Sequence, residues 1–379
     1  MPSTFPLIIL KIPPWFLGLA RKATLTCGGL LLATAAAWAF GALWFDFPFP
    51  RLRQVVAVLF AMGIIASLLL VRPRWRKISV ASGLVLFVAG WWMTLTPRID
   101  RDWMPDVAET PWAEVEGDLI TLHNVRNCDY RSETDYTVHW TTRTVRLSRL
   151  TGVDVAITFW GSPWMAHPII SFQFADAPPL AFSIETRKES SESYSAIGGL
   201  YRQFELIYVA AEERDVVALR TNQRIGEDVY LYRTTLTASA ARGRFMEYIQ
   251  SINQLHQKAR WYNALTSNCT TAIRTQHPVT DRMPWDWRLL ANGKMDELFY
   301  DLGVINTGGL PFEELKQRAR INEAARAAGP SEDFPVRIRE GRPGFPSPAP
   351  LSNDTPSPKE QGPTASGAGS SKPPLENIP

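Results

Sequence analysis

The sequence is poor in cysteine and carries little net charge, and each shortage excludes a class of protein. Its 379 residues include three cysteines and have a formal net charge of +3 at pH 7. Three cysteines are too few for a disulfide scaffold and lack the paired spacing of a structural zinc site, so we expect no metal and no cofactor. The small charge, without a long basic stretch interleaved with aromatic residues, argues against nucleic acid as a partner.

Charge is absent altogether from three apolar runs near the N-terminus. The runs comprise residues 23–45, 54–71 and 78–96. Each is long enough, at about 1.5 Å per helical residue, to cross a hydrocarbon core of about 30 Å. A cleavable signal peptide is a single short run, whereas here three runs follow one another. Residues 1–100 are therefore predicted to form a three-helix membrane anchor.

Lysine and arginine are distributed unevenly over the short connections of this anchor. They are concentrated in the N-terminal flank and in the second connection, at Lys11, Arg21, Lys22, Arg72, Arg74, Arg76 and Lys77. The first connection has only Arg51 and Arg53. Because cytoplasmic loops carry the excess of positive charge, the N-terminus is predicted to be cytoplasmic. The same rule places the large domain in the periplasm, on a multi-pass protein of the bacterial inner (cytoplasmic) membrane.

Proline, serine and glycine dominate the C-terminal end. Residues 341–379 hold 10 Pro, 6 Ser and 5 Gly. Such a composition offers too little apolar surface to offset the entropy lost on ordering. We therefore predict a disordered Pro-rich tail over residues 327–379. Residues 101–326 are left as one extracytoplasmic domain with a core of its own.

Strand and helix patterns alternate in this domain. Residues 180–185 and 204–209 alternate between apolar and polar side chains, and residues 229–236 are rich in β-branched and aromatic types, so all three predict strands. Residues 212–220 and 239–257 are typical of helices, the second with apolar residues at helical spacing. The predicted class is α+β.

One cysteine stands where a helix is expected to begin. Asn268 is a good N-cap type, which places Cys269 in the first helical turn. A thiol there feels the positive end of the helix dipole and free backbone N–H groups, which lower its pKa and can also hold an oxyanion. Two other interpretations stay open: a buried structural cysteine, or a disulfide between Cys128 and Cys269.

A nucleophilic thiol needs a base, and the histidines differ in their suitability. His277 lies about 12 Å along the same helix as Cys269 and cannot reach the sulfur. His256, at the end of the preceding helix, is possible. His167 stands at the entrance to an apolar strand and can point at a neighbouring helix terminus. The alternative for His167 is the commoner fate of a lone histidine, packing in the core.

The strand after His167 offers the third group of a catalytic set. Ser183, Glu185 and Arg187 alternate onto one face of that strand. A carboxylate in a partly buried strand needs a hydrogen-bonding partner, so Glu185 is the candidate that orients the imidazole. An ion pair of Glu185 with Arg187 or Arg202 is an equally open interpretation.

Four motifs, taken in order, resemble one bacterial family. They are Asn124-Val125-Arg126-Asn127, His167 with Ser171-Phe172, the run from Phe182 to Glu189, and Asn268-Cys269-Thr270-Thr271. The family is the Lnb N-terminal periplasmic domain, and the resemblance extends from about Arg101 to about Arg326. It implies a permuted papain-like fold of the NlpC type, in which the histidine strand precedes the cysteine helix.

The resemblance also implies roles for two residues: Cys269 as nucleophile and His167 as base. Together with Glu185 they form the candidate catalytic set, and Asn268, Ser183 and Arg187 are the candidate oxyanion or supporting residues. One branch of the family is implicated in N-acylation of bacterial lipoproteins through a cysteine thioester. That branch carries its membrane helices after the soluble domain, whereas here they come before it.

Three functions are compatible with these features. The first is a cysteine acyltransferase or hydrolase that acts on an ester or amide close to the membrane, with a membrane lipid or lipoprotein as substrate. The second is a cell-wall peptidase or amidase. The third is a non-catalytic, membrane-anchored binding module, for which the Pro-rich tail would serve as a recognition or spacer element.

Overall fold

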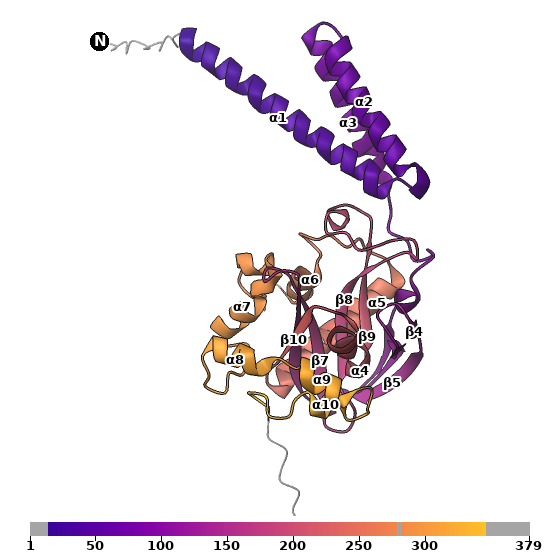
Figure 1. The fold of residues 1–379 in the computed structure, drawn as a ribbon, viewed down its shortest axis with the longest axis vertical. Helices are drawn as coiled ribbons and strands as arrows, with labels where there is room; N and C mark the ends of the chain where they lie inside the picture. Colours follow the sequence, from indigo (N-terminus) through magenta and orange to yellow (C-terminus); the bar gives the residue numbers. More distant parts are fainter. Residues whose placement is uncertain (1–13, 279, 281, 346–379) are drawn as a thin grey trace, which may run out of the picture. The chain divides into compact units, whose positions relative to one another are not determined.

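Three long helices form the N-terminal part of the chain. A computed structural model describes residues 14–278, 280 and 282–345 (Figure 1). The helices are α1 (Pro14–Asp46), α2 (Arg53–Leu70) and α3 (Arg74–Thr94). By length and composition each is able to cross a membrane. The three apolar runs are thus confirmed as helices that can span a bilayer.

Small side chains bring these helices together. Ala39, Ala42 and Ala57 are fully buried within the cluster that the helices share. Small residues allow close helix approach where lipid supplies no hydrophobic driving force. Trp92 of α3 packs its ring edge-on against Trp38 of α1, with 5.2 Å between the ring centroids. Trp92 therefore packs between helices.

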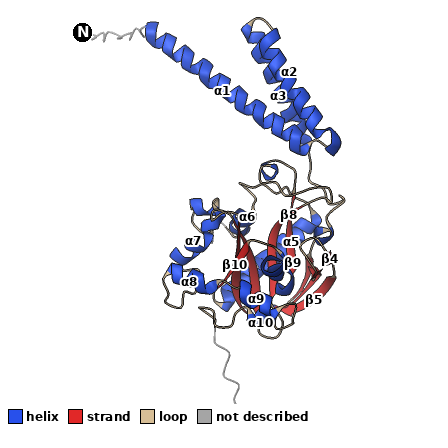
Figure 2. Ribbon diagram, in the orientation of Figure 1, coloured by secondary structure: helices blue, strands red, loops and turns tan. Residues whose placement is uncertain are grey.

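One eight-stranded sheet forms the centre of the domain (Figure 2). Its order is β1-β2-β9-β8-β7-β6-β10, and β5 also pairs with β2. The bounds are β1 Trp112–Glu116, β2 Leu119–Arg126, β5 Trp140–Arg146, β6 Leu150–Trp160, β7 Ala166–Phe174, β8 Leu180–Arg187, β9 Glu205–Ala211 and β10 Glu227–Arg233. Strands β2 and β9 pair in parallel, and the other pairs are antiparallel. A separate ribbon consists of β3 (Asp129–Tyr130) and β4 (Tyr136–Thr137).

The helix α5 (Ala238–Gln257) covers one face of this sheet (Figure 1). Its Phe245 is fully buried against Phe172 of β7, with 5.0 Å between the ring centroids, and also contacts Phe182 of β8. Burying an aromatic ring contributes roughly 1.5–3 kcal/mol of transfer free energy. The strands β7 and β8 are thereby fixed to a rigid layer.

A second layer covers the opposite face. It contains α4 (Glu213–Ala218), α9 (Asn322–Ala328) and α10 (Phe334–Arg337). Because successive side chains of a strand point to opposite faces, β8 presents Ala181 to this layer and Phe182 to α5. The helices α7 (Met295–Asp301) and α8 (Phe312–Ala319) pack beside β6 and β10. The predicted α+β class is confirmed.

The fold continues past the point where the tail was predicted to begin. Phe334 and Ile338 are fully buried in the second layer. Arg339 donates hydrogen bonds to Asp154 at 2.9 Å and to Glu213 at 2.7 Å, and both carboxylates are buried. The predicted boundary at residue 327 therefore falls inside the folded domain. The remainder of the predicted tail, residues 346–379, lies outside the described residues.

Candidate active site

Cys269 is the first residue of α6 (Cys269–Gln276), and its start is set by a capping box. The Asn268 side-chain oxygen accepts from the N–H groups of Thr270 at 3.0 Å and Thr271 at 2.8 Å, and the Asn268 N–H donates to the Thr271 hydroxyl at 2.9 Å. Such reciprocal bonds satisfy the donors that a helix start leaves unpaired. The thiol of Cys269 is buried, and the predicted helix start is correct.

All three cysteines are free, so the disulfide interpretation is wrong. Cys128 instead lies in a separate buried cluster, where its backbone N–H donates to Asp215 at 2.7 Å. Asp215 also pairs with Arg126 at 2.7 Å. The thiol of Cys269 is therefore not consumed in a disulfide.

The register of two strands brings a histidine and a carboxylate to one end of the sheet. Ile169 of β7 pairs with Ser183 of β8 in an antiparallel register. Continuing this register by two residues places Glu185 opposite His167, and cross-strand neighbours on one face lie within contact distance. The helix α6 contacts both strands. The structure thus brings together Cys269, His167 and Glu185.

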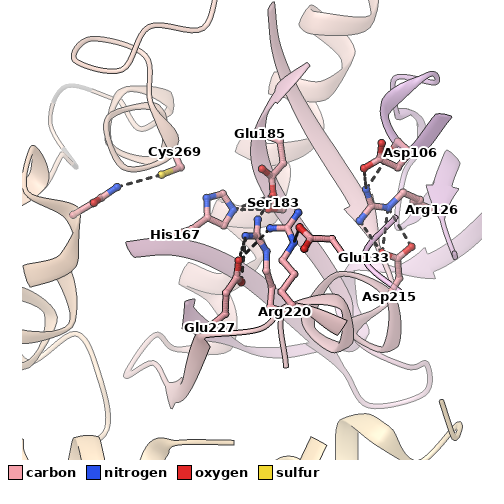
Figure 3. A network of polar contacts seen from close by, with 12 residues as sticks. Asp106, Arg126, Glu133, His167, Ser183, Glu185, Asp215, Arg220, Glu227 and Cys269 are labelled. Carbon is pink, nitrogen blue, oxygen red and sulfur yellow. Dashed lines mark hydrogen bonds and ion pairs between the residues drawn. The ribbon is translucent and has the colours of Figure 1, made fainter. Parts of the chain in front are cut away.

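A short chain of hydrogen bonds connects the imidazole to the carboxylate (Figure 3). The Nε2 atom of His167 lies 2.6 Å from the Ser183 hydroxyl, which donates to Glu185 Oε1 at 2.7 Å. The same Nε2 atom lies 3.2 Å from Glu185 Oε1. Because Nε2 faces this pair, Nδ1 is the ring nitrogen left for the thiol of Cys269. Ser183 and Glu185 are in position to fix the ring and its tautomer.

Arg220 extends this chain and was not predicted as a site residue. It stands in a π-helical turn, Leu219–Gln223, that continues α4. Its guanidinium donates to Glu185 at 3.0 Å and to Glu227 at 3.3 Å. Arg220 lies within the residues over which the family resemblance extends, and π-turns are frequent at functional sites.

The charges of this cluster favour an ion pair between the thiol and the imidazole. Burial alone lowers the pKa of His167, but the charge of Glu185 and the hydrogen bond with Cys269 outweigh it and raise that pKa to about 9. Burial raises the pKa of Cys269, but the hydrogen bond and charge of His167 bring it below its usual value. Burial also raises the pKa of Glu185, but His167 and Arg220 hold it well below its usual range. The arrangement therefore stabilises a thiolate beside an imidazolium.

Two predicted supporting residues take other roles. Arg187 donates to the carbonyl oxygens of Val107 at 2.9 Å and Ala108 at 2.5 Å, so it anchors a loop and does not join the site. Asn268 uses its side-chain oxygen for the helix cap, and its amide donates to Ala264 at 2.8 Å. Asn268 therefore positions the cysteine helix through its side-chain bonds.

The other interpretations for Glu185 and the base are also decided by contacts. Glu185 pairs with Arg220, and not with Arg187 or Arg202. His256 bonds to Thr110 at 2.8 Å and stacks on Trp112, with ring centroids 5.7 Å apart. These partners belong to the opposite edge of the sheet, at β1. His167 is the histidine that interacts with Cys269.

A cavity of about 290 Å³ opens onto the three residues. Its lining combines apolar and aromatic side chains with charged ones, including Trp160, Met165, Tyr194, Tyr262, Asp106, Lys188 and Arg224. Asn292 also lines it, and its Nδ2 atom lies 3.9 Å from the Cys269 sulfur. Asn292 was not predicted; the Asn292-Gly293 pair is a turn signal, but a turn signal does not indicate a site.

Fold and site together define a membrane protein whose α+β domain holds a Cys-His-Glu cluster, in which the cysteine and the histidine are buried and the glutamate is half-buried. Residues 136–293 match the family model of the Lnb N-terminal periplasmic domain. This match confirms the resemblance that the motifs predicted, and the matched residues include Cys269, His167 and Glu185. No curated protein and no solved structure gave a significant match to the chain. The permuted papain-like fold stays a prediction.

Proposed function

We propose that this protein is a membrane-anchored periplasmic cysteine acyltransferase or hydrolase that acts on ester or amide bonds close to the membrane. The observation that carries the proposal is the alignment of Cys269 with His167, whose far ring nitrogen contacts Ser183 and Glu185. Nucleophile, base and orienting group are the three parts that acyl transfer through a thiol requires.

The first step forms a thioester. The thiolate of Cys269 attacks the substrate carbonyl, and the carbonyl electrons move to its oxygen. When the tetrahedral intermediate collapses, the bond to the leaving group breaks and His167 donates its proton to that group. Glu185, kept ionised by Arg220, stabilises the imidazolium before this transfer. The product is an acyl group on Cys269.

The second step resolves the thioester. Neutral His167 now accepts a proton from water or from an amine or hydroxyl acceptor, which attacks the acyl carbon and releases the Cys269 thiolate. The cavity carries charged side chains such as Lys188 and Arg224 beside its apolar ones. A polar acceptor can therefore reach the sulfur, and the nature of that acceptor decides between transfer and hydrolysis.

The membrane anchor supports a substrate in or near the bilayer. Three helices able to span a membrane tether the domain, and a tether raises the effective concentration of membrane-bound substrates. The family match indicates a periplasmic domain. The chain order also supports the permuted papain-like interpretation, because the histidine strand β7 precedes the cysteine helix α6.

Intact-mass analysis of the full-length protein, purified from its own membranes, tests the proposal. Wild type should carry an acyl adduct that hydroxylamine removes, whereas Cys269→Ser should carry none and His167→Ala only a trace. Cys128→Ala is the matched control, because Cys128 is an equally buried free thiol outside the site. It should acylate like wild type.

The lipid and lipoprotein profiles of cells with wild type and with Cys269→Ala identify the donor and acceptor. A change in a lipid or lipoprotein supports the proposal, and a change confined to cell-wall peptides indicates a peptidase or amidase instead. If wild type carries no adduct and Cys269→Ala sustains normal growth and envelope composition, the binding-module function replaces the enzyme.

A further inference from the structure

The side-chain amide of Asn292 has a fixed orientation. Its Oδ1 atom accepts a hydrogen bond from the Ala166 N–H at 3.0 Å. A backbone N–H only donates, so this bond determines which end of the amide is oxygen. The Nδ2 group must then be on the other side, where it lies 3.9 Å from the Cys269 sulfur. The amide thus directs an N–H donor toward the nucleophile.

The next residue explains how Asn292 reaches this place. The Gly293 N–H donates to the Trp164 carbonyl at 3.1 Å, beside the entrance to β7. A Cβ atom on Gly293 would lie 2.3 Å from the Pro163 oxygen and 2.4 Å from the Trp164 carbonyl carbon. These are backbone atoms, which cannot move aside like a flexible side chain. The close approach requires glycine and fixes Asn292 to the strand that carries His167.

A backbone donor stands next to the same sulfur. The Asn268 side chain accepts from the second and third N–H groups of α6, at Thr270 and Thr271. For the first, on Cys269, the described part of the chain offers no acceptor. This N–H is therefore unused when the substrate is absent.

We propose that Asn292 is an oxyanion-hole residue, which acts together with the backbone N–H of Cys269. The inference rests on the proposed function. As sulfur bonds to the acyl carbon, the carbonyl oxygen gains the electron pair and accepts from both donors. When the leaving group departs, that pair returns to the C–O bond and the donors release it. Removing one such donor lowers the rate of acyl transfer by about 10²–10³-fold.

Two reactions of the same thiol separate this role from a structural one. Acylation by a p-nitrophenyl ester of a short fatty acid develops an oxyanion, whereas alkylation by iodoacetamide does not. In full-length protein, Asn292→Ala should acylate about 10²–10³-fold more slowly, with the alkylation rate of Cys269 within about threefold of wild type. In Asn292→Asp one oxygen still accepts from Ala166, but the new carboxylate beside the sulfur raises the pKa of the Cys269 thiol. Its two rates are therefore compared on the high-pH plateau of alkylation, where the same split should appear.

Asn253→Ala is the matched control, since the Asn253 amide also bridges backbone groups, accepting from and donating to Ala113 at 2.7 and 2.8 Å. It lies on α5, away from the cavity, and should acylate at the wild-type rate. Unchanged acylation in Asn292→Ala and Asn292→Asp overturns the inference, and so does an equal loss of alkylation, which marks a structural role. Failure of wild type itself to acylate, with normal alkylation, refutes the proposed function instead and removes the basis of the inference.

Discussion

Arg220 donates to the same carboxylate oxygen of Glu185 that accepts from the Ser183 hydroxyl. The arginine is itself buried and is shared with Glu227. The carboxylate of Glu185, which stabilises the imidazolium of His167, is therefore itself stabilised by a cation on another chain segment. Four predictions concern the chemistry and stability of the domain, and a fifth its orientation.

Loss of the Arg220 charge should weaken the thiolate. In Arg220→Gln the pKa of Glu185 rises, the imidazolium of His167 is less stabilised, and the pKa of Cys269 moves back toward its usual value. The pH profile of iodoacetamide alkylation should shift to higher pH. In Arg220→Lys, which keeps a cation, the profile should lie closer to that of wild type. A lower activity with an unchanged profile would mean that Arg220 only supports the fold.

Cys269 and Cys128 should differ sharply in reactivity although both are buried. Burial and the charge of Asp215 raise the pKa of Cys128 to about 12, whereas the pKa of Cys269 is lowered. Because the thiolate is the reactive form, iodoacetamide at pH 7 should modify Cys269 at least about 100-fold faster. Peptide mapping measures this ratio, which should disappear in denaturant. Equal rates in the folded protein would contradict the ion pair.

Acylation and alkylation should depend differently on pH. Both should rise as the thiol of Cys269 loses its proton. Above about pH 9, His167 loses its own proton and can no longer protonate the leaving group, so acylation should fall. Alkylation needs no acid and should remain on its plateau. Parallel stopped-flow profiles with an amide or alkyl ester, whose leaving group needs a proton, test this; acylation that stays high at pH 10 would exclude His167 as the general acid.

Arg339 should contribute strongly to stability. Arg339→Met leaves the buried Glu213 without its ion partner, which costs about 3–5 kcal/mol of unfolding free energy. Arg337→Met is the control, since Arg337 forms an exposed pair with Asp333 and should change stability by at most about 0.5–1 kcal/mol. Denaturant unfolding of both variants measures the difference. Equal effects would show that the buried cluster tolerates an unpaired acid.

The membrane orientation follows from the charges of the connections. A reporter fused after residue 100 should be periplasmic, and one inserted within residues 73–76 should be cytoplasmic. Alkaline phosphatase and a fluorescent protein give opposite signals at the two positions. A cytoplasmic signal after residue 100 would invert the topology and place Cys269 in a reducing compartment.

Local patterns were sufficient to predict much of the fold and half of the site. The helix at α5 and the strands β8, β9 and β10 follow from apolar periodicity, which is a local property. The face shared by Ser183 and Glu185 follows from strand alternation. Arg187 lies on the same face but fails as a site residue, because four residues of strand separate it from Ser183 by about 13 Å. Strand alternation predicts the face on which a side chain lies, but not how far along the strand it lies from the site.

Arg220 and Asn292 could not be placed from local patterns. Arg220 reaches Glu185 because a π-turn follows α4, and Asn292 reaches the sulfur because Gly293 allows two backbone segments to touch. Both depend on tertiary packing. The tail boundary failed for a similar reason: the composition of residues 341–379 was extended backwards over Phe334 and Ile338, whose burial no local average reveals.

The bonds of Arg339 also connect protein synthesis to folding. Arg339 follows its partners Glu213 and Asp154 by 126 and 185 residues. A ribosome therefore completes every strand of the sheet, and the cysteine helix, before the cation that pairs with both buried acids is made. A chain interrupted before this residue would contain all the proposed catalytic groups and still lack a stable interior, so truncated products should be inactive and open to envelope proteases.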